Sequence, residues 1–371
     1  MSSANKTLNI LGIRGIPAQH GGFETFAEKL AVYLAGKNWL VRVYCQEQGS
    51  GEIYESSWNG VQLIHIPVRF SGSLGSILFD FKSTLDASKR GGLNLTLGYN
   101  TALFSIAHRV RNRRNIINMD GIEWQRKKWA LPVRIWFFIN EVVGCRLADH
   151  LVADHPEIKT HLIGKASSEK ITTIAYGADE ILGATEELIT RFGVLPQQYA
   201  LVIARAEPEN SILEIVKAFS IVPRGIKLVI LGKFDPDMNP YHAEIVKVAS
   251  DEVFLLGAIY EKSIVDALRL YCRFYIHGHT AGGTNPSLVE AMGAGAAVLA
   301  QANIFNQWVA GTGALYFEVE EDCAVSINRL LTDELILASM REWSRSRFKS
   351  EYTWQGILAK YESLLNDWIN Y

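Results

Sequence analysis

The segment HGHTAGGTNPSLVEAMGAGAAVLA, residues 277–300, combines residue types that bind an anion beside a helix. Gly282 and Gly283 let a ligand approach the backbone closely, and Pro286 is a suitable first helical residue. Main-chain N–H groups and the positive end of the helix dipole would then point at one place, where a phosphate can bind. Glu290, about one turn into the helix, could accept from the two hydroxyls of a ribose. Together these features describe a nucleotide site; a tight turn with a solvated glutamate is the alternative.

A second glycine-rich loop, GIRGIPAQHGGFETF, follows the first strand-like segment and leads into a helix-like one. Gly21 and Gly22 stand directly before that helix, where they could also hold a phosphate. The glycines at 12, 15, 21 and 22 do not have the G-x-G-x-x-G spacing of dinucleotide sites. We therefore interpret the loop as a candidate phosphate cradle, with a turn that binds nothing as the alternative.

Two charged residues stand at the ends of strand-like segments. Arg205 follows YALVIA, residues 199–204, where a guanidinium could hold phosphate oxygens through two hydrogen bonds. The alternative is an exposed arginine beside Glu207 and Glu209. Asp120 follows the run NIINM, and an acid at that point could orient a substrate hydroxyl or act as a base.

A short basic segment also contains tryptophans. Arg126, Lys127 and Lys128 lie between Trp124 and Trp129, and more aromatic residues follow. Cationic side chains beside tryptophans suit the surface of an anionic membrane. The alternative is a solvated charged face over a core helix.

The scaffold for these residues is predicted by the hydrophobic pattern. Short apolar runs alternate with segments of helical periodicity in both halves of the chain. The strand-like runs begin near residues 7, 40, 93, 115, 150 and 170, and then near 199, 226, 252, 273 and 296. This alternation predicts an α/β fold with two Rossmann-like domains that face each other across a cleft. In such sheets ligands bind at the carboxyl ends of the strands, where each of the loops described above lies.

The length of 371 residues suits two domains, and the pattern breaks near residues 177–198. We expect an N-terminal Rossmann-like domain over residues 1–180 and a C-terminal one over residues 181–350. Residues 351–371 are expected to form a C-terminal helix that packs back on the N-terminal domain.

Charge and composition narrow the class of protein. Residues 1–180 hold 21 Lys and Arg against 16 Asp and Glu, whereas the remainder holds 16 against 23, which suggests different partners for the two halves. The sequence shows no signal peptide and no run near the ~20 apolar residues of a spanning helix, so we expect a cytoplasmic protein. We also expect that it binds no nucleic acid. Four scattered cysteines predict buried free thiols.

The succession GGFETFAEKLA, DGIEWQRKKW, ARAEPENSILEIVKAF, LVILG and HGHTAGGTNPSLVEAMGAG resembles the retaining glycosyltransferases of family 4, which have the GT-B fold. It is most similar to the bacterial rhamnosyltransferase-type branch that builds surface polysaccharides such as lipopolysaccharide or capsule. The resemblance covers nearly the whole chain, and its motifs are specific in combination. It implies a nucleotide-diphosphate sugar bound mainly by the second domain and an acceptor on the first.

The resemblance also assigns site residues. Glu290 matches the second glutamate of the family's E-x7-E element at the donor ribose, and Arg205 matches the arginine at the diphosphate. With Asp120 as the group that orients the acceptor hydroxyl, these three are the expected catalytic residues. The expected donor-binding residues are Gly21, Gly22, Asn210, His279, Gly282, Gly283, Thr284 and Asn285.

The chain departs from the family at two positions that matter. Gly282 stands where the first acid of E-x7-E belongs, and Asn210 stands where the family has a lysine five residues after the arginine. Both substitutions are typical of the rhamnosyltransferase-type branch, which favours an active enzyme. A histidine common in the first domain of the family is also absent, and Asp120 lies in about that region.

The resulting hypothesis is a glycosyltransferase that moves rhamnose or another hexose to a saccharide or lipid-linked saccharide with retention, on the inner face of the plasma membrane. We identify no Asp-x-Asp metal motif and expect no metal, so that protein groups must stabilise the leaving diphosphate. One alternative is a nucleotide-sugar epimerase of the same fold. The other is a relative that binds nucleotide sugars without catalysis, which Gly282 and Asn210 support best.

Overall fold

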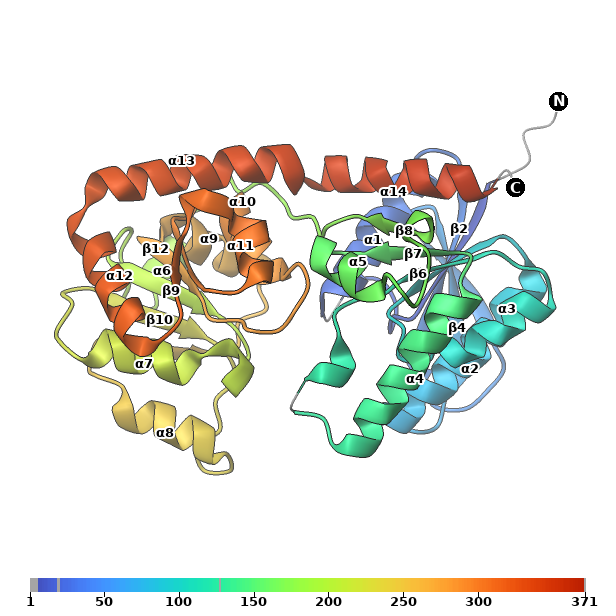
Figure 1. Ribbon diagram of the computed structural model, residues 1–371, viewed down its shortest axis with the longest axis horizontal. Helices are drawn as coiled ribbons and strands as arrows, with labels where there is room; N and C mark the ends of the chain where they lie inside the picture. The colour runs from blue at the N-terminus through green and yellow to red at the C-terminus, as the bar shows by residue number, and fades with distance from the viewer. Residues whose placement is uncertain (1–5, 19–20, 127, 370–371) are drawn as a thin grey trace. The chain divides into compact units, whose positions relative to one another are not determined.

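The computed structural model describes residues 6–18, 21–126 and 128–369 (Figure 1). Contacts between residues divide the chain into two compact units. Unit 1 consists of Met1–Ala175 together with Trp354–Tyr371, and unit 2 consists of Tyr176–Thr353. The C-terminal segment therefore belongs to the same unit as the N-terminal half of the chain.

An eight-stranded sheet forms the centre of unit 1. Its strands are β1 (Thr7–Leu11), β2 (Leu40–Gln48), β3 (Tyr54–Trp58), β4 (Val61–Val68), β5 (Leu93–Leu97), β6 (Asn115–Asn118), β7 (His150–Ala153) and β8 (Ile171–Thr173). They follow the order β3-β4-β2-β1-β5-β6-β7-β8, and all neighbours are parallel except the edge pair β3–β4. The order reverses between β1 and β5, which makes that position a topological switch point.

Helices provide the crossovers that parallel strands require. They are α1 (Gly21–Ala35), α2 (Gly72–Arg90), α3 (Ile106–Val110), α4 (Leu131–Leu147) and α5 (Pro156–Leu162), with the 3-10 turns η1 (Ala102–Ser105), η2 (Glu123–Gln125) and η3 (Ser168–Lys170). Unit 1 also contains α14 (Trp354–Ile369), which follows the last strand of the chain. Helix α14 packs against α1, where the ring centroids of Phe26 and Tyr361 lie 4.5 Å apart (Figure 1).

Unit 2 contains a six-stranded parallel sheet. Its strands are β9 (Tyr199–Ile203), β10 (Lys227–Leu231), β11 (Val253–Gly257), β12 (Phe274–His277), β13 (Val298–Gln301) and β14 (Leu315–Phe317). Their order is β11-β10-β9-β12-β13-β14. The helices are α6 (Glu187–Thr190), α7 (Ile212–Ser220), α8 (Pro240–Val248), α9 (Lys262–Tyr271), α10 (Pro286–Gly293), α11 (Ile304–Ala310), α12 (Glu320–Thr332) and α13 (Glu334–Glu351), with the turns η4 (Pro208–Asn210) and η5 (Gly311–Gly313).

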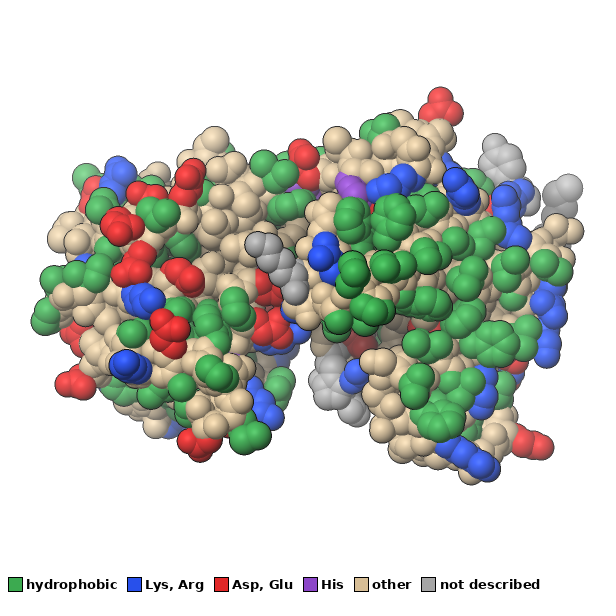
Figure 2. All heavy atoms as spheres, turned by 60° about the horizontal axis from the view of Figure 1, so that its bottom comes forward, with side chains coloured by type: hydrophobic (Ala, Val, Ile, Leu, Met, Phe, Trp, Pro, Cys, Tyr) green, Lys and Arg blue, Asp and Glu red, His purple; other side chains and the backbone are tan. Residues whose placement is uncertain are grey.

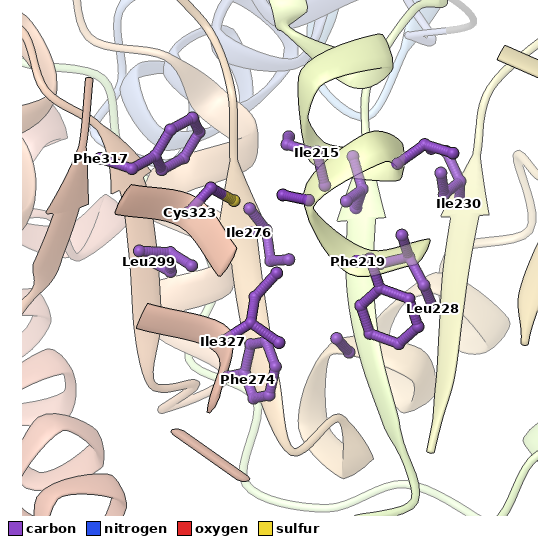
Figure 3. Close-up of a cluster of buried hydrophobic side chains, with 14 of the residues drawn as sticks. Ile215, Phe219, Leu228, Ile230, Phe274, Ile276, Leu299, Phe317, Cys323 and Ile327 are labelled. Atoms are coloured by element: carbon purple, nitrogen blue, oxygen red, sulfur yellow. The ribbon is translucent and has the colours of Figure 1, made fainter. Parts of the chain in front are cut away.

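Side chains of the unit 2 strands alternate between two cores, as the period of two in a strand requires. On β9, Leu201 belongs to one buried cluster and Val202 to the other. Figure 3 shows the second cluster, in which Phe219 of α7 and Ile276 of β12 meet the side chains of the neighbouring strands. Since both faces of the sheet are buried, its strands read as continuous apolar runs in the sequence.

The predicted fold class is confirmed, since both units are Rossmann-like α/β layers, and all eleven predicted strands form. The hairpin β3–β4 and the edge strand β14 were not predicted. Strand β3, YESSW, is mostly exposed and polar, and β14 is only three residues long, so neither has a clear apolar signal. All four cysteines are buried and free. Within the described ranges, no helix is long and apolar enough to cross a membrane.

Candidate functional site

The strand order of unit 2 reverses between β9 and β12, and two loops leave the sheet at this switch point. Residues 204–211 follow β9, and residues 278–285 follow β12. A cavity of about 170 Å³ lies between the strand ends and these loops. Its polar lining comes from Arg205, Asn210, His277, His279, Asn285 and Ser287. Ligand pockets usually measure roughly 300–1,000 Å³, so this cavity is of a size for one part of a larger ligand, such as its phosphates.

Asn210 joins the two loops. Its side-chain amide donates to the carbonyl of Arg205 at 2.9 Å, and its Oδ1 lies 2.7 Å from Nδ1 of His279. Because Oδ1 can only accept, Nδ1 of His279 must carry the hydrogen. The other ring nitrogen, Nε2, is therefore the atom whose protonation decides whether the ring is charged. Asn210 thus fixes the orientation and tautomer of His279, which faces the cavity.

Glycine is required at three points of the second loop. A Cβ on Gly278 would lie 2.1 Å from the carbonyl oxygen of Asn210, and Gly283 has φ +108. At Gly282 a Cβ would lie 2.6 Å from the ring of Phe305 on α11. The space that the family's first acid would need is therefore filled by an aromatic ring.

The main-chain N–H groups before α10 divide into two sets. Asn285 caps the helix, because its Oδ1 accepts from the amide of Ser287, and the next two amides donate to the Asn285 carbonyl. The amides of Gly282, Gly283 and Asn285 itself have no hydrogen-bond partner among the described residues. These three amides remain available to an anion. Thr284 of the same loop is buried.

Arg205 extends beside the cavity with a largely exposed guanidinium. The group lies 3.4 Å from a carboxylate oxygen of Glu207 and 3.8 Å from one of Glu209. Pairs of this kind between exposed groups are worth at most about 1 kcal/mol, so a phosphate can take over the guanidinium at little cost.

Glu290 does not line the cavity. It lies one helical turn beyond Ser287, on the same side of α10, and its Oε2 accepts from the buried guanidinium of Arg269. The Oε1 atom has no hydrogen-bond partner among the described residues. Arg269 therefore holds Glu290 in place, with one oxygen left to accept from a ligand.

His277, which the sequence analysis did not assign, is part of the cavity wall. It is 4% exposed, and its Nε2 has no hydrogen-bond partner among the described residues. Burial, with the neighbouring His279, lowers the pKa of His277 to about 3, so the ring is neutral. A buried polar atom without a partner is unusual in a folded protein, and a ligand could supply the missing bond. The apolar run around His277 gave no signal for this role.

Unit 1 has its own switch point, between β1 and β5. Gly12, just after β1, has φ +83, and a Cβ there would lie 2.2 Å from the carbonyl oxygen of Leu97. The loop then runs to Gly21 and Gly22, which form the start of α1. Gln19 and His20 lie outside the described residues. The two glycines are thus placed at the carboxyl edge of this sheet, as a phosphate cradle would require.

Asp120 lies two residues after β6, with φ +54 in the left-handed region. Burial and the nearby carboxylate of Glu123 raise the pKa of Asp120 to about 6. An acid with a pKa near neutrality can exchange a proton with a substrate hydroxyl. Asp120 and Gly21 lie at separate points of the sheet edge, because β1 and β6 are separated by β5.

The basic segment with tryptophans is largely engaged by the protein itself. Arg126 pairs with Glu123, whose other oxygen accepts from Trp129 at 3.0 Å. The indole of Trp124 donates to buried Glu141 at 3.1 Å. Lys127 lies outside the described residues. The two indoles and Arg126 therefore support the local fold.

Contrary to our expectation, the chain does contain an Asp-x-Asp spacing, at Asp235 and Asp237. They lie in the exposed loop after β10, where Oδ1 of Asp235 accepts from the amide of Met238. Across the part of the chain that the structure describes, no group of three or more His, Cys, Asp or Glu side chains could hold a metal ion.

Comparison with known proteins gives a family match for the first part of the chain and a fold for the whole chain. Residues 5–179 match the family described as "Domain of unknown function (DUF1972)". No curated protein matches the chain. Among solved structures, the chain is similar to sucrose-phosphate synthase of Thermosynechococcus elongatus, with a TM-score of 0.80 and 16% identity over 98% of this chain and 99% of that chain.

Two further structures are similar over nearly their full length. HepE of Anabaena, in complex with UDP and glucose, gives a TM-score of 0.76 at 16% identity over 98% of this chain and 99% of that one. An α,α-trehalose-phosphate synthase of Burkholderia vietnamiensis gives 0.72 at 10% identity over 98% and 100%. The chain therefore has the GT-B fold of these proteins, with its two Rossmann-like sheets.

Proposed function

We propose that this chain is a retaining glycosyltransferase that moves a sugar from a nucleotide-diphosphate donor to a saccharide or lipid-linked saccharide acceptor. Rhamnose or another hexose is the proposed sugar, and surface polysaccharide synthesis is the proposed role. The similar HepE structures contain UDP with glucose, or UDP-glucose, and a further similar structure contains UDP-2-fluoro glucose. These ligands support a nucleotide-sugar donor.

The observation that carries the proposal is the set of unpaired amides at residues 282, 283 and 285, beside the switch-point cavity of unit 2. Negative charge grows on the diphosphate as the bond between the sugar and its phosphate oxygen breaks. Fixed N–H groups and the Arg205 guanidinium are suited to stabilise that charge without rearrangement. His279, held by Asn210, adds a donor when its Nε2 is protonated.

The acceptor hydroxyl is proposed to attack the sugar carbon on the face that the diphosphate leaves. Its oxygen forms the new glycosidic bond, the electron pair of the old bond stays on the phosphate oxygen, and the hydroxyl proton passes to that oxygen. Glu290, with Oε1 unpaired and Oε2 held by Arg269, is proposed to bind the donor ribose. Asp120 is proposed to orient the acceptor hydroxyl.

A second candidate is a relative that binds the donor and transfers nothing. Asn210 serves to hold His279, and Gly282 packs against Phe305, so neither supplies the charge that the family has at its position. A site with less charge can still bind a nucleotide sugar through its amides.

Incubation with a panel of nucleotide-diphosphate sugars and isolated lipid-linked saccharide tests both candidates. The transferase should release nucleotide diphosphate and extend the acceptor, and Arg205→Ala should lower turnover at least about 100-fold. Arg191→Ala is the matched control, because Arg191 is an exposed arginine of the same unit that pairs with Glu261. Glu290→Ala should weaken donor binding in both cases. Binding without transfer would support the second candidate, and an epimerised donor would contradict both.

A further inference from the structure

Helix α2 carries an apolar stripe that the described parts of unit 1 cover only in part, because Leu78 packs against a buried cluster while Leu74 and Phe81 are exposed. Leu74, Leu78, Phe81 and Leu85 are spaced by four, three and four residues, which places them on one side of the helix. Leu74 is 69% exposed and Phe81 is 46% exposed. A surface helix normally turns such a stripe toward the core, so an exposed stripe indicates a missing partner.

Helix α4 carries a second stripe of the same kind. Leu131, Ile135, Phe138 and Ile139 follow a spacing of four, three and one residues, and they are 66%, 51%, 43% and 46% exposed. The opposite side of α4 holds Asn140, Glu141 and other buried residues. The helix therefore has a buried side that is partly polar and an outer side that is apolar, which reverses the usual arrangement.

The two stripes are linked through η1 and α3, which pack against α2, while η1 also packs against α4. Phe81 meets Phe104 of η1 at 5.4 Å between ring centroids, and the amide of Leu103 donates to the Asn140 side chain. Figure 2 shows hydrophobic side chains gathered over this part of unit 1, with Lys and Arg side chains around them. The apolar face is defined by Leu74, Phe81, Leu103, Ile106, Val110, Leu131, Ile135, Phe138 and Ile139.

The segment that forms this face is strongly basic. Residues 69–146 contain 13 Lys and Arg against five Asp and Glu. Three of these five acidic side chains are paired or buried. Glu141 is buried beside His161 and Lys165, and Asp86 pairs with Arg90. Burial raises the pKa of Asp80 to about 6. Exposed basic side chains of this segment include those of Lys89, Arg111, Lys128 and Arg146, together with Arg109 and Arg114, which share the carboxylate of Asp149.

A basic cavity lies beside the α2 stripe. It measures about 290 Å³ at the carboxyl ends of β2 and β4, and Phe70, Leu78, Arg69 and Lys82 line part of it. The ammonium of Lys82 is held at 3.0 Å from the carbonyl oxygen of Pro67. The cavity is thus lined by both apolar and cationic groups. Such a lining is complementary to a phospholipid, in which a phosphate is joined to acyl chains.

We propose that the apolar face docks on a bilayer that contains anionic phospholipid, with α2 and α4 lying in the interface plane. Exposed aliphatic and aromatic side chains would enter the acyl boundary, and the surrounding basic side chains would contact the headgroups. A second copy of the chain fits less well, because two strongly basic faces would repel each other. Docking does not depend on the transferase activity, although it would bring unit 1 close to a lipid-linked acceptor.

The test is co-sedimentation with vesicles, using phosphatidylcholine alone and an equal mixture of phosphatidylcholine and phosphatidylglycerol. Wild-type protein should bind the mixed vesicles at least about tenfold more tightly, and salt should weaken that binding. Replacing Leu74 and Phe81 with Ser should reduce the binding at least about tenfold. The matched control variant carries Val325→Ser and Leu335→Ser on unit 2, where these side chains are 68% and 84% exposed. This variant should bind the vesicles like wild type.

Equal vesicle binding by the Leu74→Ser, Phe81→Ser variant and by wild type would overturn the proposal, provided that both have the same circular dichroism. Absence of wild-type binding to either vesicle would also overturn it. Self-association in sedimentation velocity that disappears in the variant would assign the face to a second copy instead. Donor binding measured without vesicles separates the two proposals, since the variant should bind donor normally, and failure of wild type to bind donor would affect only the transferase.

Discussion

The folded protein disfavours the charged form of the Asp120 carboxyl group. Its folded pKa of about 6 lies above the usual value of about 3.9 for an unfolded aspartate. Between these two values the folded state holds a proton that the unfolded state has lost. The contribution of Asp120 to stability is therefore greatest below about pH 4, falls as pH rises to about 6, and is constant above that.

This sign can be tested by urea denaturation of wild type and Asp120→Asn from pH 4 to pH 7. The Asn side chain does not titrate, so the wild-type free energy of unfolding should fall relative to the variant across this range. Glu52→Gln, at an exposed position of the same unit, is the control and should keep the wild-type pH dependence. A constant difference between wild type and Asp120→Asn would show that the carboxyl is freely hydrated.

Single residues also show how far the sequence could predict the site. Arg205, Asn210, His279 and Asn285 were named as site residues, in large part from the resemblance to family 4, and all four line the switch-point cavity. The role of Asn210 could not be predicted from the sequence, since its bonds to Arg205 and His279 depend on how two distant loops meet. For the same reason, sequence alone gave no sign of the contact between Gly282 and Phe305.

Elements were predicted where their signal is local. Helix α10 begins with Asn285 as its cap and Pro286 as its first residue, and both are visible in the sequence. Strand β3 was missed because it forms the exposed edge of the sheet and lacks an apolar run, whereas β4 is mostly buried and its apolar run is interrupted by Gln62, His65 and Pro67. The apolar outer side of α4 was also missed, because periodicity identifies a stripe without showing which side faces the core.

The start of α10 allows a prediction that separates stability from binding. Asn285→Ala removes the bond from the Ser287 amide and should lower the free energy of unfolding by about 1 kcal/mol. Asn239→Ala is the matched control, because Asn239 caps α8 through the amide of Tyr241. Both variants should lose similar stability in urea denaturation. Only Asn285→Ala should weaken donor binding in calorimetry, because only α10 begins at the proposed diphosphate site. Equal donor affinity in the two variants would argue against that placement.

At the scale of the whole molecule, the chain completes unit 1 only when it returns with α14. Helix α14 buries six apolar or aromatic side chains that are at most 8% exposed: Trp354, Ile357, Leu358, Tyr361, Leu364 and Leu365. Tyr361 packs against Phe26, and its hydroxyl accepts from the buried Asn118 side chain at 2.8 Å. Residues 1–175 therefore lack part of their own core and one partner of a buried polar group.

Ending the chain after Thr353 should for this reason loosen unit 1 and leave unit 2 intact. Hydrogen exchange followed by mass spectrometry resolves the two units, since each yields its own peptides. Exchange in α1 and β6, which hold Phe26 and Asn118, should rise at least about tenfold, while the β9–β14 sheet stays protected. Tyr361→Phe keeps the ring and removes only the hydroxyl, so it should raise exchange around Asn118 alone. Unchanged protection of α1 in the shortened chain would mean that residues 1–175 form a complete core without α14.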